Sequence, residues 1–312
     1  MNNKCTVVMY HYVRDLEKSR YPAIKGLRTR EFRAQLDVLS KNFQFVAIED
    51  LIRSVREDVS LPSNAVHLSF DDGYRDHFDT VFPILQQKGI PGSFFPPSGA
   101  VLERKALDVN KIHFVLAAAS STERLLKEVF QCLDSYRERY TLLSNEHYFS
   151  KLAAQGQFDS REIIFIKRLL QNELELEVRQ RIVNDLFIRY IPEGEDVLAE
   201  ELYMTLDQIK TMHRSGMFIG SHGYQHLWLG LQAPDVQKRE IDRADAFLDE
   251  VGVRSDGRVI AYPYGSYNSG LIQLLTDKGY CLGLTSEQGD AVCTKENAFL
   301  LKRRDTNEFA KT

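Results

Sequence analysis

Short apolar runs alternate with amphipathic stretches along most of the chain. Six apolar runs are expected to be strands: 6–10, 65–70, 92–95, 217–221, 258–262 and 280–285. Five intervening stretches carry apolar positions at helical spacing: 29–43, 75–89, 206–216, 234–252 and 269–279. Strands that alternate with helices in this way are typical of a parallel α/β architecture.

Residues 103 to about 200 interrupt this alternation. Three stretches in this part show helical periodicity: 109–119, 122–140 and 161–191. An insertion of this length far exceeds the usual βα loop of about 2 to 6 residues. We therefore expect a helical subdomain at 103–200, packed over one end of a barrel that is formed by 1–102 and 201–312.

Length and charge narrow the class of protein. A chain of 312 residues fits one α/β barrel with an insertion, or two modest domains, and 43% hydrophobic residues is ordinary for a soluble globular protein. The net charge is −4, and no basic tract is dense enough to follow a phosphate backbone, so a nucleic acid is not an expected partner. The pattern predicts no particular oligomeric state.

The N-terminal stretch and the cysteines bear on location. The first apolar run has about five residues, shorter than a signal-peptide core of roughly 7 to 15. No stretch approaches membrane-spanning length, so we expect a cytoplasmic protein. The four cysteines form no CxxC pair, and buried reduced thiols are therefore expected rather than disulfides or a zinc site.

Two motifs whose residues could carry out chemistry follow predicted strands. AVHLSFDDGYRDHF places Asp71 and Asp72 at the end of the strand 65–70, either as a turn or for chemistry. SHGYQH places His222 and His226 four residues apart, a spacing that is common for two imidazoles on one metal. In a parallel barrel both motifs lie at the C-terminal mouth, where such folds build their sites.

Two further motifs also stand at strand ends. In AYPYGSYN, Pro263 and Gly265 shape a turn whose tyrosines are expected to wall a cleft, or the segment is simply an aromatic-capped loop. In MYHYV, His11 ends the first strand and points to the same mouth, although a single histidine beside two tyrosines is also compatible with core packing.

Together these motifs resemble those of the polysaccharide deacetylases of carbohydrate esterase family 4, the NodB-like family. SFDDG is similar to the first motif of that family, SHGYQH to the second and AYPYG to the third, while LGLTSEQG resembles its late strand and loop. The resemblance covers 4–100 and 203 to about 300. It implies a distorted (β/α)7 barrel that removes acetyl groups from N-acetylated sugars with one divalent metal ion.

The resemblance also implies residue roles. Asp72, His222 and His226 would bind the metal, and Asp71 would be the general base. One carboxylate and two neutral imidazoles suit zinc, with cobalt or another first-row metal as alternatives, and leave positions open for water and the substrate carbonyl oxygen. The charge of the cation would also offset the repulsion between the adjacent carboxylates.

The third motif is implied to contact the substrate. The backbone N–H of Tyr264 would hold the oxyanion together with the metal, and Pro263 and Tyr262 belong to the same substrate-contacting turn.

Two positions differ from the usual family pattern. Ala261 stands where the family has an arginine that orients the catalytic acids, and no histidine after His226 is present to protonate the leaving amine. MYHYV and IAYPYG resemble the poly-N-acetylglucosamine deacetylase branch, whose layout is permuted, so His11 is implied as the proton donor. Three other histidines are interpreted as packing or surface residues: His67, His77 and His213.

The basic residues of the tail LLKRRDTNEF have two interpretations. Arg303 or Arg304 could replace the absent motif arginine or hold a substrate phosphate. Ordinary surface charge is the simpler interpretation, and the sequence favours it.

The expected function is the metal-dependent hydrolysis of the N-acetyl group of an amino sugar, with release of acetate. A cytoplasmic location would favour a lipid-linked or nucleotide-linked precursor over finished polysaccharide. Two alternatives stay open: hydrolysis of another amide on the same fold, and a carbohydrate-binding barrel without turnover.

Overall fold

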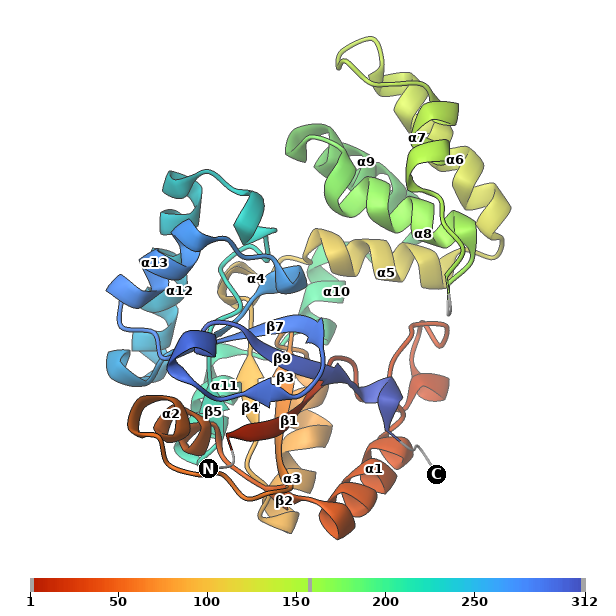
Figure 1. Ribbon diagram of the computed structural model, residues 1–312. Helices are drawn as coiled ribbons and strands as arrows, with labels where there is room; N and C mark the ends of the chain where they lie inside the picture. The colour runs from red at the N-terminus through yellow and green to blue at the C-terminus, as the bar shows by residue number, and fades with distance from the viewer. Residues whose placement is uncertain (1–2, 157–158, 310–312) are drawn as a thin grey trace. The chain divides into compact units, whose positions relative to one another are not determined.

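The computed structural model describes residues 3–156 and 159–309, and the chain forms two compact units (Figure 1). The first unit contains Met1–Asp15, Gly26–Lys105 and Ala199–Thr312. The second contains Leu16–Lys25 and Ala106–Leu198. All the residues that the sequence singles out for chemistry belong to the first unit.

The first unit holds the sheet and the helices around it. Its strands are β1 (Lys4–Tyr10), β2 (Gln44–Phe45), β3 (Ala65–Asp71), β4 (Ser93–Phe95), β5 (Phe218–Ile219), β6 (Val259–Ala261), β7 (Leu282–Gln288), β8 (Ala291–Val292) and β9 (Leu301–Asp305). Its helices are α1 (Thr29–Asn42), α2 (Ile48–Glu57), α3 (Phe82–Lys88), α4 (Ser98–Glu103), α11 (Leu206–Arg214), α12 (Pro234–Val251) and α13 (Ser269–Asp277).

The main strands form a curled parallel sheet. Within the described residues its order is β5-β4-β3-β1-β9-β7-β6, with β2 beside β3 and β8 antiparallel to β1. Ser221, just beyond β5, forms a parallel bridge with Ile260 of β6, so the two ends of this order meet. The predicted distorted (β/α)7 barrel is therefore confirmed.

The strands are apolar because both of their faces are buried. Val8 and Phe70 pack into the core beneath the outer helices, whereas Val7, Ala65 and Leu284 pack into the barrel interior. Successive side chains of a strand point to opposite faces, so a strand covered on both sides must be apolar at nearly every position. This double burial is why short continuous apolar runs predicted the strands.

Among the seven strands of the main order, one has no such signal. Residues 301–305 form β9, which lies between β1 and β7 although its sequence is LKRRD. Leu301 and Arg303 are buried and Lys302 is exposed, so the strand alternates although its residues are mostly charged. The interpretation of this tail as ordinary surface charge is wrong for Arg303.

The second unit is helical throughout its described residues. Its helices are α5 (Asp108–Ala118), α6 (Thr122–Tyr136), α7 (Asn145–Leu152), α8 (Arg161–Arg168), α9 (Leu176–Tyr190) and the start of α10 (Glu195–Leu202). Ser121, Ser144 and Ser160 cap three of these helices by accepting a hydrogen bond from a backbone N–H in the first turn. The single periodic stretch 161–191 is divided into α8, a π-helical turn and α9.

A segment close to the N-terminus also belongs to this unit. The side chains of Arg20 and Tyr21 each donate a hydrogen bond of 2.7 Å to Glu193. The Tyr21 ring packs edge-on against Phe114 at 5.2 Å between centroids. Leu16–Lys25 therefore joins the helices of the second unit, a pairing that periodicity along the chain does not predict.

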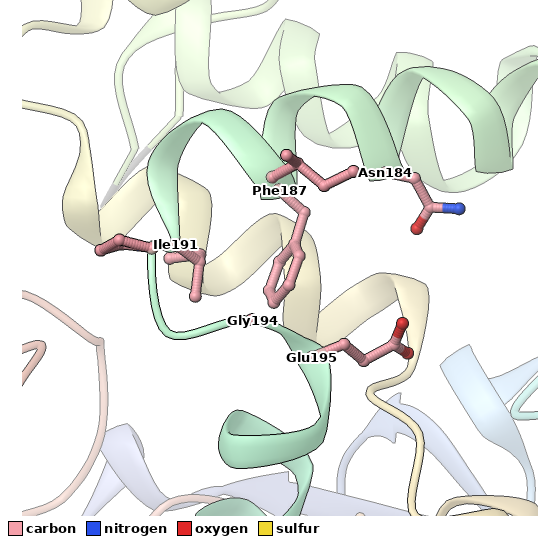
Figure 2. A pocket seen from close by; sticks show the side chains of 7 residues that line it. Asn184, Phe187, Ile191, Gly194 and Glu195 are labelled. Atoms are coloured by element: carbon pink, nitrogen blue, oxygen red, sulfur yellow. The ribbon is translucent and has the colours of Figure 1, made fainter.

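The second unit contains a cavity of about 360 Å³ between the end of α9 and the start of α10 (Figure 2). Phe187 and Ile191 give it apolar walls, and Asn184 and Glu195 are its polar lining. Lys111 donates to Asn184 at 2.8 Å and pairs with Glu195 at 3.0 Å, so both polar side chains are already engaged in structural contacts.

All four cysteines are buried and free, as predicted. Among the described residues, no helix combines the length and the apolar character that crossing a membrane requires.

His67 lies inside the barrel and is held as a neutral imidazole. Its Nδ1 donates to the carbonyl oxygen of Val46 at 2.9 Å, and its Nε2 accepts from the Ser93 hydroxyl at 2.9 Å. Burial lowers the pKa of His67 to about 4, against the 6.5 of an ordinary histidine. Its contribution to stability is complete above pH 6.5 and is lost as the pH falls toward 4.

We predict that His67→Gln reduces the acid sensitivity of folding. Between pH 6.5 and 4 the wild type should lose up to about 3 kcal/mol more of its free energy of unfolding than the variant, because its buried imidazole must be protonated. Urea unfolding of both proteins at a series of pH values measures this difference. Parallel curves for the two proteins over that interval would contradict the prediction.

Candidate functional site

The two adjacent carboxylates stand where β3 ends in a left-handed turn. Asp72 has φ 72° and Gly73 has φ 66°. A Cβ on Gly73 would lie 2.7 Å from Cβ of Pro96, so only glycine fits at that position. The turn lets neighbouring carboxylates face different partners: Asp71 contacts Arg303, whereas Asp72 contacts two histidines.

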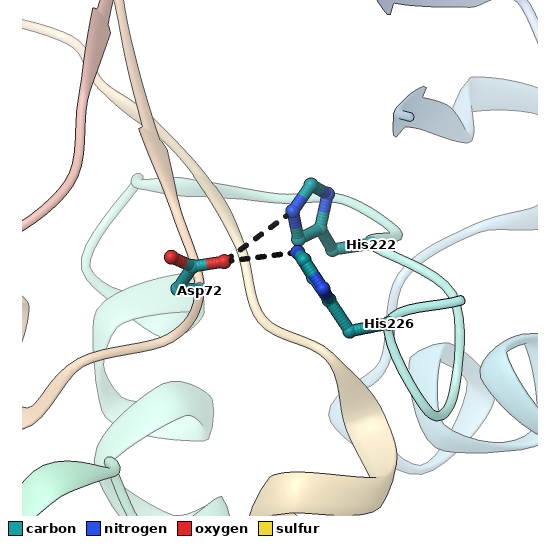
Figure 3. Close-up of side chains that lie close together, drawn as sticks. All are labelled: Asp72, His222 and His226. Carbon is teal, nitrogen blue, oxygen red and sulfur yellow. Dashed lines mark ion pairs between the residues drawn. The ribbon is translucent and has the colours of Figure 1, made fainter. Parts of the chain in front are cut away.

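Asp72, His222 and His226 converge from two loops at the C-terminal ends of β3 and β5 (Figure 3). Oδ1 of Asp72 lies 3.5 Å from Nε2 of His222 and 3.3 Å from Nε2 of His226. All three side chains are buried, and one possible ligand atom from each lies within 4.8 Å of the others. The structure thus brings together the three residues that the sequence predicts to bind a metal.

Local contacts orient both imidazoles. Nδ1 of His222 lies 2.6 Å from the carbonyl oxygen of Ala261, which can only accept, so Nδ1 carries a proton and Nε2 is the ring nitrogen that a metal ion could use. His226 adopts a left-handed backbone conformation with φ 57°. Its ring packs edge-on against that of Tyr264, with 4.6 Å between centroids.

The electrostatics of this cluster fit a cation. Oδ1 of Asp72 is buried and has no hydrogen-bond partner among the described residues. Burial alone would raise the pKa of Asp72, but its contacts with His222 and His226 outweigh burial and hold the pKa well below the usual range. A buried ionised oxygen is costly unless a charge is paired with it. A divalent ion at this point would pair with that oxygen and accept both Nε2 lone pairs.

Asp71 is paired with a buried arginine. Nη1 of Arg303 lies 2.9 Å from Oδ1 and 2.8 Å from Oδ2 of Asp71. The guanidinium also donates to the carbonyl oxygen of Thr285 at 2.8 Å and to the Ser69 hydroxyl at 3.3 Å. Burial favours a raised pKa for Asp71, but the charge and hydrogen bond of Arg303, together with the charges of His222 and His11, outweigh burial and lower it. Asp71 is therefore ionised at neutral pH.

Arg303 lies beside the acid pair, and Arg304 does not. Arg303 is 1% exposed, whereas the Arg304 side chain is 35% exposed and pairs with Asp290 at 2.7 Å and Glu308 at 2.9 Å. Adjacent residues of a strand point to opposite faces, so only one of them can enter the barrel. Arg303 lies two residues after the apolar Leu301 in the same strand, so the two side chains share a face. This spacing is the signal that could have selected Arg303.

His11 lies beside the acid pair. β1 and β3 are parallel and are paired up to Tyr10 opposite Phe70, the residues directly before His11 and Asp71. After burial and the closer partners, the charge of His11 also contributes to the lowered pKa of both carboxyls. Its carbonyl oxygen accepts a hydrogen bond of 2.8 Å from Nε2 of His77, which anchors the end of the strand.

The third motif forms a 3-10 turn over Pro263–Gly265. Tyr264 has φ 57°, and its ring stacks on Trp228 at 4.4 Å with 6° between planes. Trp228 is the sole tryptophan of the chain, and the sequence motifs do not point to it. Its position two residues after His226 is the signal that could have found it.

The prediction for Tyr262 is wrong. This residue is 1% exposed and packs in an apolar cluster with Ile260 and Leu271, so it does not wall a cleft. Pro263 is also buried, and Tyr264 is the half-buried member of the turn. Strand alternation explains the error, because Tyr262 directly follows β6 and its ring points to the packed side.

The fold and the site define a barrel with an Asp-His-His centre and a separate, arginine-paired aspartate. The family model for polysaccharide deacetylases matches residues 58–141 and 190–283, more than half of the chain, and the chain belongs to this family. Asp71, Asp72, His222, His226 and Tyr264 lie inside the matched residues. His11 and Arg303 lie outside them.

Curated relatives match a shorter part. YxkH of Bacillus subtilis is 32% identical over 94 residues, which cover 30% of this chain and 33% of that protein. The poly-β-1,6-N-acetyl-D-glucosamine N-deacetylase of Escherichia coli K12 is 33% identical over 96 residues, 30% of this chain and 14% of that protein. The matched segment thus spans a third or less of the length of these relatives.

Solved structures share the fold across nearly the whole chain. IcaB from Ammonifex degensii matches with a TM-score of 0.59 and 20% identity, covering 98% of this chain and 92% of that one. The Streptococcus pyogenes deacetylase PplD, solved in complex with acetate, matches with a TM-score of 0.58 and 18% identity, covering 98% and 93%.

We predict that the Asp-His-His cluster binds zinc or cobalt. His222→Ala and His226→Ala should each weaken binding by more than about 100-fold, because loss of the groups that merely orient a ligand already costs about 10- to 100-fold. Calorimetric titration of chelator-treated protein measures the affinity. His213→Ala, which removes an imidazole outside the cluster, is the control, and equal weakening in that variant would contradict the prediction.

A second prediction concerns the buried ion pair. Arg303→Met should lower the free energy of unfolding of metal-free protein by about 3 to 5 kcal/mol, because it leaves the Asp71 carboxylate buried without its partner. Adding Asp71→Asn to this variant should restore part of the loss. Urea unfolding of the two single variants and the double variant forms the cycle. Strictly additive losses would show that the two side chains are not coupled.

Proposed function

We propose that this chain hydrolyses the N-acetyl group of an amino sugar, in a polysaccharide or its precursor, and releases acetate. The proposal rests mainly on one observation: the two adjacent aspartates have different partners. Asp72 faces His222 and His226, and Asp71 faces Arg303. Membership of the polysaccharide deacetylase family gives the reaction class. A relative named as a poly-β-1,6-N-acetyl-D-glucosamine N-deacetylase supports an N-acetylated glycan as the substrate.

Asp72, His222 and His226 would hold one divalent ion. One oxygen and two nitrogen donors suit zinc first, and cobalt or another first-row ion next. When bound, the ion supplies Lewis acidity, which polarises an amide carbonyl and lowers the pKa of an attacking water.

Asp71 would act as the general base. Its carboxylate takes a proton from the attacking water as the new C–O bond forms at the acetyl carbon. Arg303 serves this step in two ways: it lowers the pKa of Asp71 against the effect of burial, and it fixes both carboxylate oxygens. In this respect Arg303 replaces the arginine that the family carries at the position of Ala261.

His11 would act as the general acid. The leaving amine takes a proton from its imidazole as the C–N bond breaks, so the products are acetate and a free amino sugar. The register of β1 on β3 supports this role, since the paired residues Tyr10 and Phe70 directly precede His11 and Asp71.

The turn of the third motif would face the acetyl group. The backbone N–H of Tyr264 is the candidate donor to the oxyanion that forms on the carbonyl oxygen. The left-handed conformation of Tyr264 and its stack on Trp228 support this assignment, because together they fix the backbone of the turn beside His226.

We expect acetate release from N-acetylglucosamine oligomers or from lipid- or nucleotide-linked N-acetyl sugars. Release should stop when the protein is treated with a chelator and return with zinc or cobalt. Asp71→Asn should lower kcat by about 10²- to 10⁴-fold while metal binding is kept, since it removes only the base. His11→Ala should lower kcat by a similar factor.

His213→Ala is the matched control for His11→Ala and should retain activity, because His213 lies on α11 outside the catalytic cluster. Metal-loaded wild type that releases no acetate from any of these donors would contradict the proposed reaction. Full activity of His11→Ala would show that His11 is not the general acid, without contradicting the proposed reaction.

A further inference from the structure

Tyr74, two residues after Asp72, contacts the carboxylate oxygen of Asp72 that does not face the two histidines. Its hydroxyl donates a hydrogen bond of 2.6 Å to Oδ2 of Asp72. The other oxygen of the same carboxylate, Oδ1, is the one that lies 3.3 to 3.5 Å from the two imidazole nitrogens. The two oxygens of Asp72 therefore have separate partners.

A phenol suits this contact chemically. The phenol hydroxyl of a tyrosine donates one hydrogen bond, and an ionised carboxylate offers only acceptors. A hydrogen bond to an ionised carboxylate is about twice as strong as one between neutral groups. Because Oδ2 accepts this hydrogen bond, only Oδ1 of the carboxylate faces the space between His222 and His226.

Tyr74 is itself held on all sides. It is 0% exposed, and its ring stacks on that of Tyr12 at 4.0 Å with 13° between planes. Tyr203 stacks at 6.5 Å, and His77 packs edge-on at 5.6 Å. An aromatic side chain fixed by three rings has little freedom to move its hydroxyl away from Asp72.

The backbone around the turn is fixed by a segment remote in sequence. Tyr74 forms an antiparallel bridge with Tyr203, and the N–H of Met204 donates to the carbonyl oxygen of Gly73 at 3.0 Å. The left-handed conformation of Asp72 is thus supported by neighbouring backbone, as a residue with positive φ needs.

We propose that Tyr74 is a positioning residue for the metal centre. Its hydroxyl donates a hydrogen bond to Oδ2 of Asp72, and this leaves Oδ1 as the carboxylate oxygen that binds the ion. This inference rests on the proposed function, in that Asp72 ligates a metal. Tyr74 does not contact substrate or reacting atoms in this account. Its effect is exerted on the geometry of one ligand.

The test compares Tyr74→Phe with a matched loss of a buried hydroxyl. Tyr10→Phe serves as the control, because Tyr10 is also 0% exposed on the neighbouring strand and contacts Phe32 and Phe70 rather than a ligand. Both variants and the wild type are treated with a chelator and titrated with Zn²⁺ by calorimetry. The absorption spectrum of the Co²⁺-loaded proteins reports the geometry around the ion.

We expect Tyr74→Phe to bind Zn²⁺ about 10- to 100-fold more weakly than the wild type and to alter the Co²⁺ spectrum. Tyr10→Phe should match the wild type in both measurements. If Tyr74→Phe is less stable, the rise in melting temperature on adding Zn²⁺ is compared instead, since ligand linkage isolates metal affinity from the stability of the metal-free protein.

Three outcomes are distinct. Weakened Zn²⁺ binding in Tyr74→Phe alone supports the inference. Equal Zn²⁺ affinity and equal Co²⁺ spectra in Tyr74→Phe and wild type overturn it and leave the metal centre standing. A wild-type protein that binds no Zn²⁺ or Co²⁺ overturns the metal centre itself, and the positioning role with it.

Discussion

The structure depends on the burial of two adjacent negative charges. Asp71 and Asp72 are 2% and 4% exposed, and an isolated carboxylate in such surroundings would be driven to its neutral form. Each buried carboxylate has its own partner: a guanidinium from β9 pairs with Asp71, and two imidazoles from the loop after β5 face Asp72. The left-handed turn at Asp72 makes this division possible, because it directs consecutive side chains to different partners.

The barrel supplies partners that lie far apart in sequence. β9 lies between β1 and β7, so its arginine reaches the interior beside Asp71, and the bridge between Ser221 and Ile260 brings the histidine loop back to the same end. The acid pair, the arginine and the histidines thus meet at the C-terminal ends of parallel strands, the end at which barrels of this kind place their chemistry. The helical unit contributes none of the residues assigned a role in this account.

Much of the fold and the site is predictable from sequence, for identifiable reasons. Strands buried on both faces show as apolar runs, and motifs directly after such runs fall at one end of the barrel, so the pattern brings the DDG and SHGYQH motifs to the same end, and the family resemblance selects Asp72, His222 and His226 from them. β9 is not predictable in this way, because LKRRD has the composition of an exposed tail, and its burial follows from its place between two strands. The prediction for Tyr262 fails for a related reason: which face of a strand points inward is a property of the whole sheet.

In the proposed mechanism, Asp72 holds a metal ion and Asp71 acts as the base. A crystal structure of the protein loaded with zinc, with anomalous data at the zinc edge, tests it most directly. We expect a single ion about 2.0 to 2.2 Å from Oδ1 of Asp72 and from Nε2 of His222 and His226. Asp71 should stay paired with Arg303. An ion held by Asp71, or no ion at this cluster in protein that binds zinc elsewhere, would contradict the account.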